Sequence, residues 1–289
     1  MPHIRPDDAF AACLGKFRPS SRCYNGDAVP DIQHEAVLER FNRTAEAYVQ
    51  HGAERDATEK LAKRLEFAGV KPADLMLDVA CGPGAFVLAA APRVRFARGI
   101  DLTPGMLRQA RQLRRERGIE NAGFDRGEAE DLPYANGIFD LVSCQFAFHH
   151  MPHPEASLRE MIRVTRPAGR LLIVDSLGPE DPATRKLRDR IERLRDASHT
   201  NSLSAAGCLA LFEKNGLAVL KQKVQKWSHS LTEWMLRAGV KPSDEAYRAV
   251  RRAIEESMPG DRAGFAPEVQ GDDLLIQHCQ GTFLLEKRL

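Results

Sequence analysis

The feature that most constrains the fold is a repeated change between short apolar runs and longer amphipathic stretches, from residue 75 to residue 175. A short apolar run that ends at glycine or proline is typical of a strand buried in a parallel sheet. The predicted strands are Leu75–Ala80, Arg98–Leu102, Phe124–Glu128, Phe139–Phe146 and Arg170–Asp175. Helical patterns separate most of them, and strands that alternate with helices build βαβ units. We therefore predict an α/β fold with a doubly wound, mostly parallel sheet.

Two more strands are expected later in the chain. The runs Leu217–Trp227 and Leu274–Glu286 have strand character, and residues 231–258 between them show helical spacing. We expect these two strands to form an antiparallel pair that completes a seven-stranded sheet. The helical segment between them, at about 228–265, is then an insertion that caps the carboxyl edge of the sheet.

The N-terminal part of the chain is organised differently. Residues 1–33 contain four prolines and two glycines and show no period, so we expect an irregular arm. Residues 34–50 and 53–68 carry apolar side chains at helical spacing. The predicted organisation is an arm (1–33), N-terminal helices that form a lid (34–70) and a main domain (71–289).

Charge and cysteine content argue against several classes of protein. The chain has 42 Lys and Arg against 40 Asp and Glu, a net charge of +2, so we expect no nucleic-acid partner. No apolar run approaches the roughly 20 residues of a membrane span, and no secretory signal is evident. The six cysteines form no C-x-x-C pair. We expect reduced thiols, no metal site and a cytoplasmic location.

A glycine turn follows the first predicted strand, in the sequence Asp78-Val79-Ala80-Cys81-Gly82-Pro83-Gly84. Glycines at this spacing let a ligand approach the backbone, because no Cβ intervenes. Asp101 ends the next strand, 17 residues after Gly84 (101 − 84), where an acid can accept hydrogen bonds from ribose hydroxyls. Position 87 is Val where a third glycine would complete the dinucleotide fingerprint, which weakens the NAD interpretation.

Four segments in order resemble the motifs of class I S-adenosylmethionine-dependent methyltransferases: LDVACGPGAF, GIDLTPGMLRQA, GEAEDLPYANGIFDLVSC and FHHMPHPEASLREMIRVTRPAGRLLIVD. The most similar branch contains the ubiquinone and menaquinone biosynthesis C-methyltransferases and the sugar or natural-product O-methyltransferases. The resemblance covers about residues 75–176 and extends weakly to 41–50 and 193–204. It implies a Rossmann-like sheet and an enzyme that uses S-adenosyl-L-methionine and releases S-adenosyl-L-homocysteine.

The resemblance also implies roles for individual residues. Asp78 and the turn that contains Ala80, Gly82 and Gly84 would hold the methionine part of the cofactor, and Asp101 would bind its ribose. The remaining cofactor-binding positions are Leu102 and Met106 beside the adenine, Glu128 and Ala129 at its amino edge, Gln145 at the amino-acid end, and Tyr48 closing over the cofactor. The family commonly has Asp-Ala where this chain has Glu128-Ala129.

Three histidines follow the fourth predicted strand, where the carboxyl edge of the sheet meets a substrate. An imidazole is a suitable general base near neutral pH, so His149 and His150 are the catalytic candidates. Successive side chains diverge, and at most one of the pair is expected to face the site. The alternative is that both only shape the loop. His153 is a weaker candidate for the base, and His199, in the stretch RLRDASHT, is a further residue that could reach the site.

The predicted function is methyl transfer to an O, N or C nucleophile of a small organic molecule. The alternatives are a tRNA or protein methyltransferase and a non-catalytic S-adenosylmethionine-binding scaffold. A further alternative is an NAD(P)-dependent dehydrogenase, which Val87 makes less favoured. The sequence leaves open the acceptor and whether the chain forms a homodimer.

Overall fold

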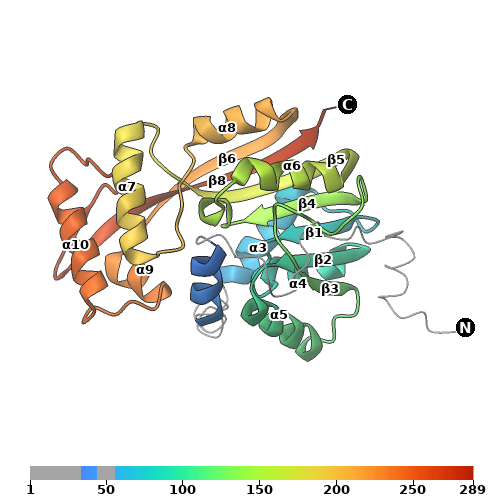
Figure 1. Cartoon of the computed structure of the whole chain (residues 1–289), viewed down its shortest axis with the longest axis horizontal. Helices are drawn as coiled ribbons and strands as arrows, with labels where there is room; N and C mark the ends of the chain where they lie inside the picture. The colour runs from blue at the N-terminus through green and yellow to red at the C-terminus, as the bar shows by residue number, and fades with distance from the viewer. Residues whose placement is uncertain (1–33, 44–55, 289) are drawn as a thin grey trace, which may run out of the picture.

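The computed structural model describes residues 34–43 and 56–288 (Figure 1). Its centre is one sheet with the strand order β3-β2-β1-β4-β5-β8-β6, and a short strand, β7, pairs with β8. The strands are β1 (Leu75–Val79), β2 (Phe96–Asp101), β3 (Ala122–Arg126), β4 (Phe139–Gln145), β5 (Thr165–Leu177), β6 (Leu217–Ser230), β7 (Glu268–Gln270) and β8 (Asp273–Lys287). The described part of the sheet thus has one strand more than the seven predicted, because the three-residue β7 showed no pattern of its own.

The pairing confirms the predicted fold class. The first five strands are parallel neighbours, and β8 runs antiparallel to both β5 and β6. The strand order changes direction between β1 and β4, which is the position at which open α/β sheets bind ligands beyond their carboxyl ends. Strands β5 and β6 are longer than predicted, since β5 extends to Leu177 and β6 to Ser230.

Helices cover both faces of the sheet. The helices with printed bounds are α3 (Asp56–Ala68), α4 (Ala85–Ala90), η1 (Ala91–Arg93), α5 (Pro104–Glu116), η2 (Phe148–His150), α6 (Pro154–Val164), α7 (Pro182–Arg195), α8 (Ala205–Lys214), α9 (Leu231–Arg237) and α10 (Glu245–Ser257). A further helix spans 34–43. One apolar core joins the sheet to α6 and α8, and a second joins its other face to α3, α4 and α5. This is the doubly wound arrangement.

A third apolar core lies at the end of the molecule that contains α7, α9 and α10 (Figure 1). Trp234 and Met235 of α9 pack there with Val250 and Ile254 of α10, against Ile191 of α7. The ends of β6 and β8 extend into this lobe. Along the chain, helices α9 and α10 stand between the long strands β6 and β8, as predicted. Helix α7 precedes β6 in the chain but shares the same core, so we call α7, α9 and α10 together the insertion lobe. No helix in the described ranges has the length and apolar character that spanning a membrane requires.

Candidate functional site

The glycine turn after β1 requires backbone conformations that few residues adopt. Gly82 and Gly84 have φ values of +54° and +79°, and Ala80 has a φ of +55°. A Cβ on Gly84 would lie 2.6 Å from the ring of Phe124, so the turn packs directly on β3. A Cβ on Gly82 would meet no atom within 4 Å. The turn therefore has open space beside Gly82, whereas Gly84 is packed against Phe124 of β3.

Asp101 ties the ends of two neighbouring strands together. Its carboxylate accepts hydrogen bonds from the backbone N–H of Gly82 and of Thr103, both at 2.8 Å. The side chain is buried, and burial raises its pKa against these two bonds. A carboxylate has about four lone-pair sites, so the group retains capacity for hydroxyl donors. The geometry fits the predicted ribose contact.

Asp78 lies beneath the turn, inside the sheet. Burial raises its pKa to about 7, against the hydrogen bond that Ser143 Oγ donates to it at 2.6 Å. The charge of Asp101 raises the pKa further. Near neutral pH this carboxyl is therefore partly protonated and partly ionised. A cation beside it would stabilise the ionised form.

Gln145, at the end of β4, forms a hydrogen bond through only one of the two polar atoms of its side-chain amide. Its Oε1 accepts a hydrogen bond from Arg64 Nη1 at 3.0 Å. Its buried Nε2 makes no hydrogen bond of good geometry in the described structure and only approaches Asp78, where it lowers the pKa of that carboxyl. The guanidinium of Arg64 also lies over the ring of Phe146, 4.9 Å from its centroid. An orphaned amide donor beside a guanidinium suits a carboxylate ligand.

The other predicted cofactor residues lie at the same edge. Met106 is buried in the first turn of α5, and Leu102 is half-buried just before it. The backbone N–H of Gly127 donates to Asp101 O at 3.1 Å, which brings the half-buried Glu128 and Ala129 alongside. Tyr48 lies outside the described residues, as do positions 44–50 of the predicted first helix.

The structure distinguishes His149 from His150. His149 Nδ1 is 2.6 Å from Asp175 Oδ1, and its backbone N–H donates to Asp175 Oδ2 at 3.0 Å. Burial alone lowers the pKa of His149, but the charge of Asp175 and the hydrogen bond to it raise the pKa overall. Burial and the neighbouring His149 hold the pKa of His150 well below its usual value. His149 is thus the more basic ring, held with Nε2 directed away from Asp175.

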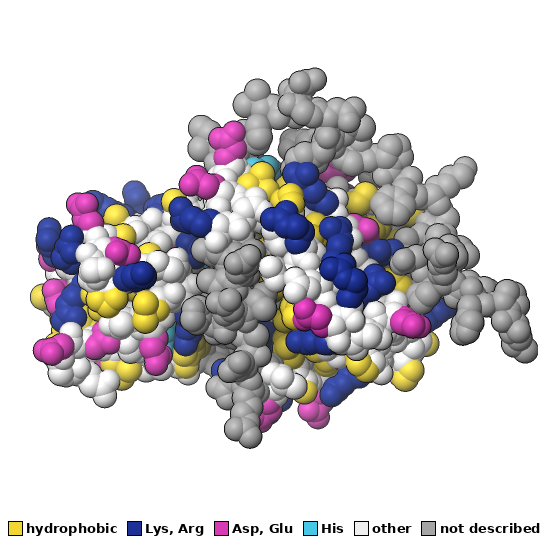
Figure 2. Space-filling view, turned by 90° about the horizontal axis from the view of Figure 1, so that it is seen from below, with side chains coloured by type: hydrophobic (Ala, Val, Ile, Leu, Met, Phe, Trp, Pro, Cys, Tyr) yellow, Lys and Arg dark blue, Asp and Glu magenta, His cyan; other side chains and the backbone are white. Residues whose placement is uncertain are grey.

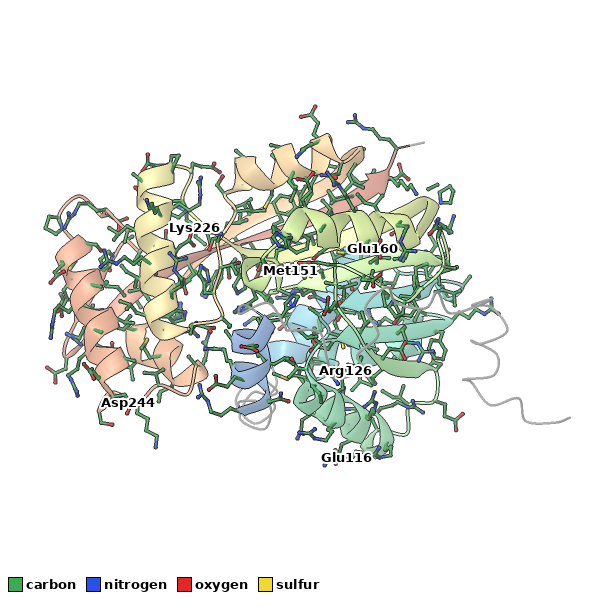
Figure 3. The ribbon with its side chains drawn as sticks, in the orientation of Figure 1. Glu116, Arg126, Met151, Glu160, Lys226 and Asp244 are labelled. Carbon is green, nitrogen blue, oxygen red and sulfur yellow. The ribbon has the colours of Figure 1, made fainter. Side chains whose placement is uncertain are left out.

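The segment 196–200, which follows α7, packs against the histidine loop. Thr200 donates to His149 O from both its backbone N and its Oγ1, each at 2.8 Å. His199 lies beside His149, with 5.6 Å between the ring centroids. Met151, which ends the loop, lies in the middle of the molecule, between the sheet and the insertion lobe (Figure 3). His153, by contrast, is exposed.

Sequence reasoning missed two residues of this arrangement. Asp175 is the last residue of the predicted fifth strand, so its place at the carboxyl edge could have marked it as a partner for the histidines. Arg64 gave no local signal, because it stands 81 positions before Gln145. Within 34–43 and 56–288, no three His, Cys, Asp or Glu side chains are grouped so as to hold a metal ion.

Comparisons with known proteins identify the family to which the chain belongs. A family described as "Methyltransferase domain" matches residues 71–239. The uncharacterized methyltransferase YcgJ of Bacillus subtilis is 34% identical over 248 residues, which cover 85% of this chain and 96% of YcgJ. The crystal structure of YcgJ has a TM-score of 0.75 and 27% identity, covering 80% of this chain and 99% of that one. UbiE of Ectopseudomonas mendocina, a ubiquinone/menaquinone biosynthesis C-methyltransferase, is 32% identical over 172 residues, 56% of this chain and 66% of UbiE.

These matches confirm that the chain is an enzyme and that the motif resemblance was correct. The family match spans more than half of the chain and contains the glycine turn, Asp101 and the histidine loop. The chain belongs to the class I S-adenosylmethionine-dependent methyltransferases, among the UbiE-like enzymes.

Proposed function

We propose that the enzyme transfers the methyl group to a hydroxyl or amine of a small organic molecule. The observation that carries this proposal is the His149–Asp175 pair beside the predicted cofactor residues. An O–H or N–H nucleophile loses its proton to a base as it attacks, whereas a ring carbon loses its proton only after the methyl group is attached. The names of the UbiE relatives place them in quinone biosynthesis, which supports a small acceptor. Figure 2 shows Lys and Arg side chains gathered near the middle of one face, with Asp and Glu side chains around them. The net charge of only +2 does not favour an RNA acceptor.

We propose that the turn Ala80–Gly84, Asp78 and Gln145 hold the methionine end of S-adenosylmethionine. Arg64 joins them, because its guanidinium and the orphaned Gln145 Nε2 suit the carboxylate of the ligand. Asp101 binds the ribose. Leu102, Met106, Glu128 and Ala129 line the adenine, and Tyr48 closes over the ligand. The bound cofactor supplies a methyl group that is already activated on a sulfonium.

The residues of the chain then have two tasks. His149 takes the proton of the nucleophile on Nε2, and Asp175 stabilises the imidazolium that forms. Asp175 is the positioning residue, since it holds both the ring and the backbone of His149. The surrounding elements hold the nucleophile in line with the methyl group and exclude water. This positioning lowers the entropic cost of reaching the reactive geometry.

The N-terminal helices are proposed as the lid of this site, and the contacts of helix 34–43 support that role. Asn42 Oδ1 accepts from Gly105 N at 2.8 Å, next to the Asp101 turn. The ring of Phe41 packs edge-on against His150, with centroids 5.2 Å apart, and Arg40 pairs with Asp196 at 2.7 Å. The helix thus contacts the cofactor edge, the histidine loop and the end of α7.

Limited proteolysis tests the lid. With saturating S-adenosylhomocysteine, cleavage within residues 34–70 should become slower than in the free protein, because a closed lid exposes less backbone. Cleavage in the exposed turn at Gly271 serves as the internal reference. Equal rates in both samples would contradict the lid.

Label transfer tests the function itself. The purified protein, given methyl-labelled S-adenosylmethionine and a fractionated extract of its source cells, should place the label on oxygen or nitrogen of a small molecule. Label on carbon would contradict the proposed hydroxyl or amine acceptor, and label in RNA or protein would establish the other acceptor class. Cofactor binding with no transfer from a complete extract would favour the scaffold.

We propose a cytoplasmic enzyme, which is supported by the free thiols of the four described cysteines. A homodimer is the proposed assembly to test by light scattering.

A further inference from the structure

A second histidine–carboxylate pair stands beside the first. His199 Nε2 is 2.9 Å from Asp189 Oδ1, and both side chains are buried. The same oxygen of Asp189 accepts from the backbone N–H of Ser202 at 3.0 Å. This carboxylate is therefore held in place by its own helix and by the loop beyond, and it fixes the ring of His199 in turn.

The two pairs come from different parts of the fold but meet at one place. His149 and Asp175 belong to the carboxyl edge of the sheet, whereas Asp189 and His199 belong to α7 and the segment that follows it. The two imidazole centroids are 5.6 Å apart, with 38° between the ring planes. Thr200 bonds to His149 O, so the two rings cannot separate without breaking this clamp.

The carboxylates also decide which nitrogen of each ring is bare. In a neutral imidazole one nitrogen donates and the other accepts. Asp175 takes the Nδ1–H of His149 and Asp189 takes the Nε2–H of His199. Nε2 of His149 and Nδ1 of His199 are then left as acceptors, and neither has a hydrogen bond to another residue in the described ranges. Because the ring centroids are 5.6 Å apart, the two imidazoles are close enough for each to accept from one of two neighbouring donors on a ligand.

We propose that the methyl acceptor carries two neighbouring hydroxyl groups, one bound by each histidine. This inference rests on the proposed function and names its substrate class. One hydroxyl gives its proton to His149 Nε2 while its oxygen bonds to the methyl carbon. The bond from that carbon to sulfur breaks, and its electron pair stays on sulfur. The other hydroxyl keeps its proton and donates a hydrogen bond to His199 Nδ1.

The second hydroxyl provides specificity because of what its absence leaves behind. A molecule with a single hydroxyl would bury His199 Nδ1 without a donor, and an unpaired buried polar group is costly. We expect such a molecule to bind about tenfold more weakly than its dihydroxy analogue. His199 is therefore a specificity-determining residue, distinct from the base.

Three small probes test the proposal on the full chain saturated with S-adenosylhomocysteine: benzene-1,2-diol, 2-methoxyphenol and phenol. Their dissociation constants are measured by NMR titration of the wild type, His199→Ala and Asp189→Asn. The second variant keeps the imidazole but removes the carboxylate that selects its bare nitrogen. The exposed Asp272→Asn is the control, matched to Asp189→Asn.

The diol should bind the wild type and the control about tenfold more tightly than either single-hydroxyl probe. The preference should fall to about twofold or less in His199→Ala and should shrink in Asp189→Asn. A wild-type preference near one, a preference that survives His199→Ala, or no binding of the diol would each overturn the proposal. If S-adenosylhomocysteine itself does not bind, the proposed cofactor use fails instead, and the two failures are distinct.

Discussion

At the scale of single residues, the proposed chemistry depends on which carboxylate or histidine lies beside each titratable group. Asp175 raises the pKa of the adjacent His149, whereas burial lowers that of His150, two neighbours in sequence with opposite shifts. Asp78 and Asp101 lie together under the glycine turn, and burial raises both pKa values. The same residue type thus has different chemistry according to its neighbours.

Replacing Asp175 with Asn should lower kcat by about 100-fold or more, because the ring of His149 loses its orientation and its charge partner. The rate should rise with pH as His149 loses its proton. Since Asp175 holds the pKa of His149 above its usual value, this rise should move to lower pH in the variant. The pH profile of kcat measures both effects, with the exposed Asp272→Asn as control. An unchanged profile would return His149 to a structural role.

Asp78 should make cofactor binding depend on pH. Its pKa of about 7 leaves it partly protonated at neutral pH, and the positive charge of bound S-adenosylmethionine favours the ionised form. Binding then releases a proton, so affinity should increase as pH rises toward 7, by up to about tenfold per pH unit, and level off above. Calorimetry from pH 5.5 to 8.5 measures this. Asp78→Asn should remove the slope, and a flat wild-type curve would contradict the idea.

At the scale of elements, the turn between β1 and α4 combines local geometry with packing. Gly82 and Gly84 share positive φ values, but only Gly84 lies against another side chain, the ring of Phe124. Helix 34–43 shows a related principle, since its neighbouring residues Arg40, Phe41 and Asn42 contact three separate elements. The role of helix 34–43 therefore depends on its contacts with the rest of the fold as well as on its own sequence.

The two glycines form a matched pair for mutation. Gly84→Ala should reduce the free energy of unfolding by about 2–5 kcal/mol, from backbone strain and from the clash with Phe124. Gly82→Ala should lose only the strain, about 1–3 kcal/mol, because its Cβ meets open space. Urea unfolding compares them, and equal losses would show that the contact with Phe124 relaxes freely.

At the scale of the whole molecule, the proposed site lies where the sheet meets the insertion lobe, and that lobe contains its own buried histidines. His229 Nε2 and His278 Nδ1 are 2.7 Å apart, among Trp227, Trp234 and Glu192. Burial lowers the pKa of His229 to about 3 and that of His278 to about 4. Both rings are therefore neutral in the folded protein.

The pair should make the protein less stable in acid. Below the unfolded pKa of about 6.5, the unfolded chain binds protons that the folded His278 does not, so stability falls as pH decreases toward 4, by about 3 kcal/mol for this residue. The raised pKa of Asp78 acts in the opposite direction over the same range. The test therefore compares the free energy of unfolding in urea at pH 7.5 and at pH 5.0. It compares the wild type with the double variant that carries both His229→Gln and His278→Gln. The double variant should lose less stability than the wild type and the exposed control His153→Gln, and parallel losses would contradict the assignment.

The sequence by itself determined the order of the strands along the chain, the class of sheet and the glycine turn, because periodicity and turn residues are local signals. Motifs within about a hundred residues of chain also led to the predicted cofactor residues, which stay a prediction, and pointed to the loop that carries the histidines. It did not predict β7, whose three residues form a strand only because β8 lies beside them. The lengths of β5 and β6 likewise depend on β8.

Only the tertiary structure decided which side chains meet. Sequence left His149 and His150 equivalent, and the carboxylate of Asp175, 26 positions away, separates them. Arg64 reaches Gln145 across 81 positions, and the segment after α7 brings a second histidine to the first. The physical reason is that a hydrogen bond needs its two groups within about 3 Å, and packing of distant elements sets that distance. Local pattern thus specifies the elements, and their contacts specify the chemistry.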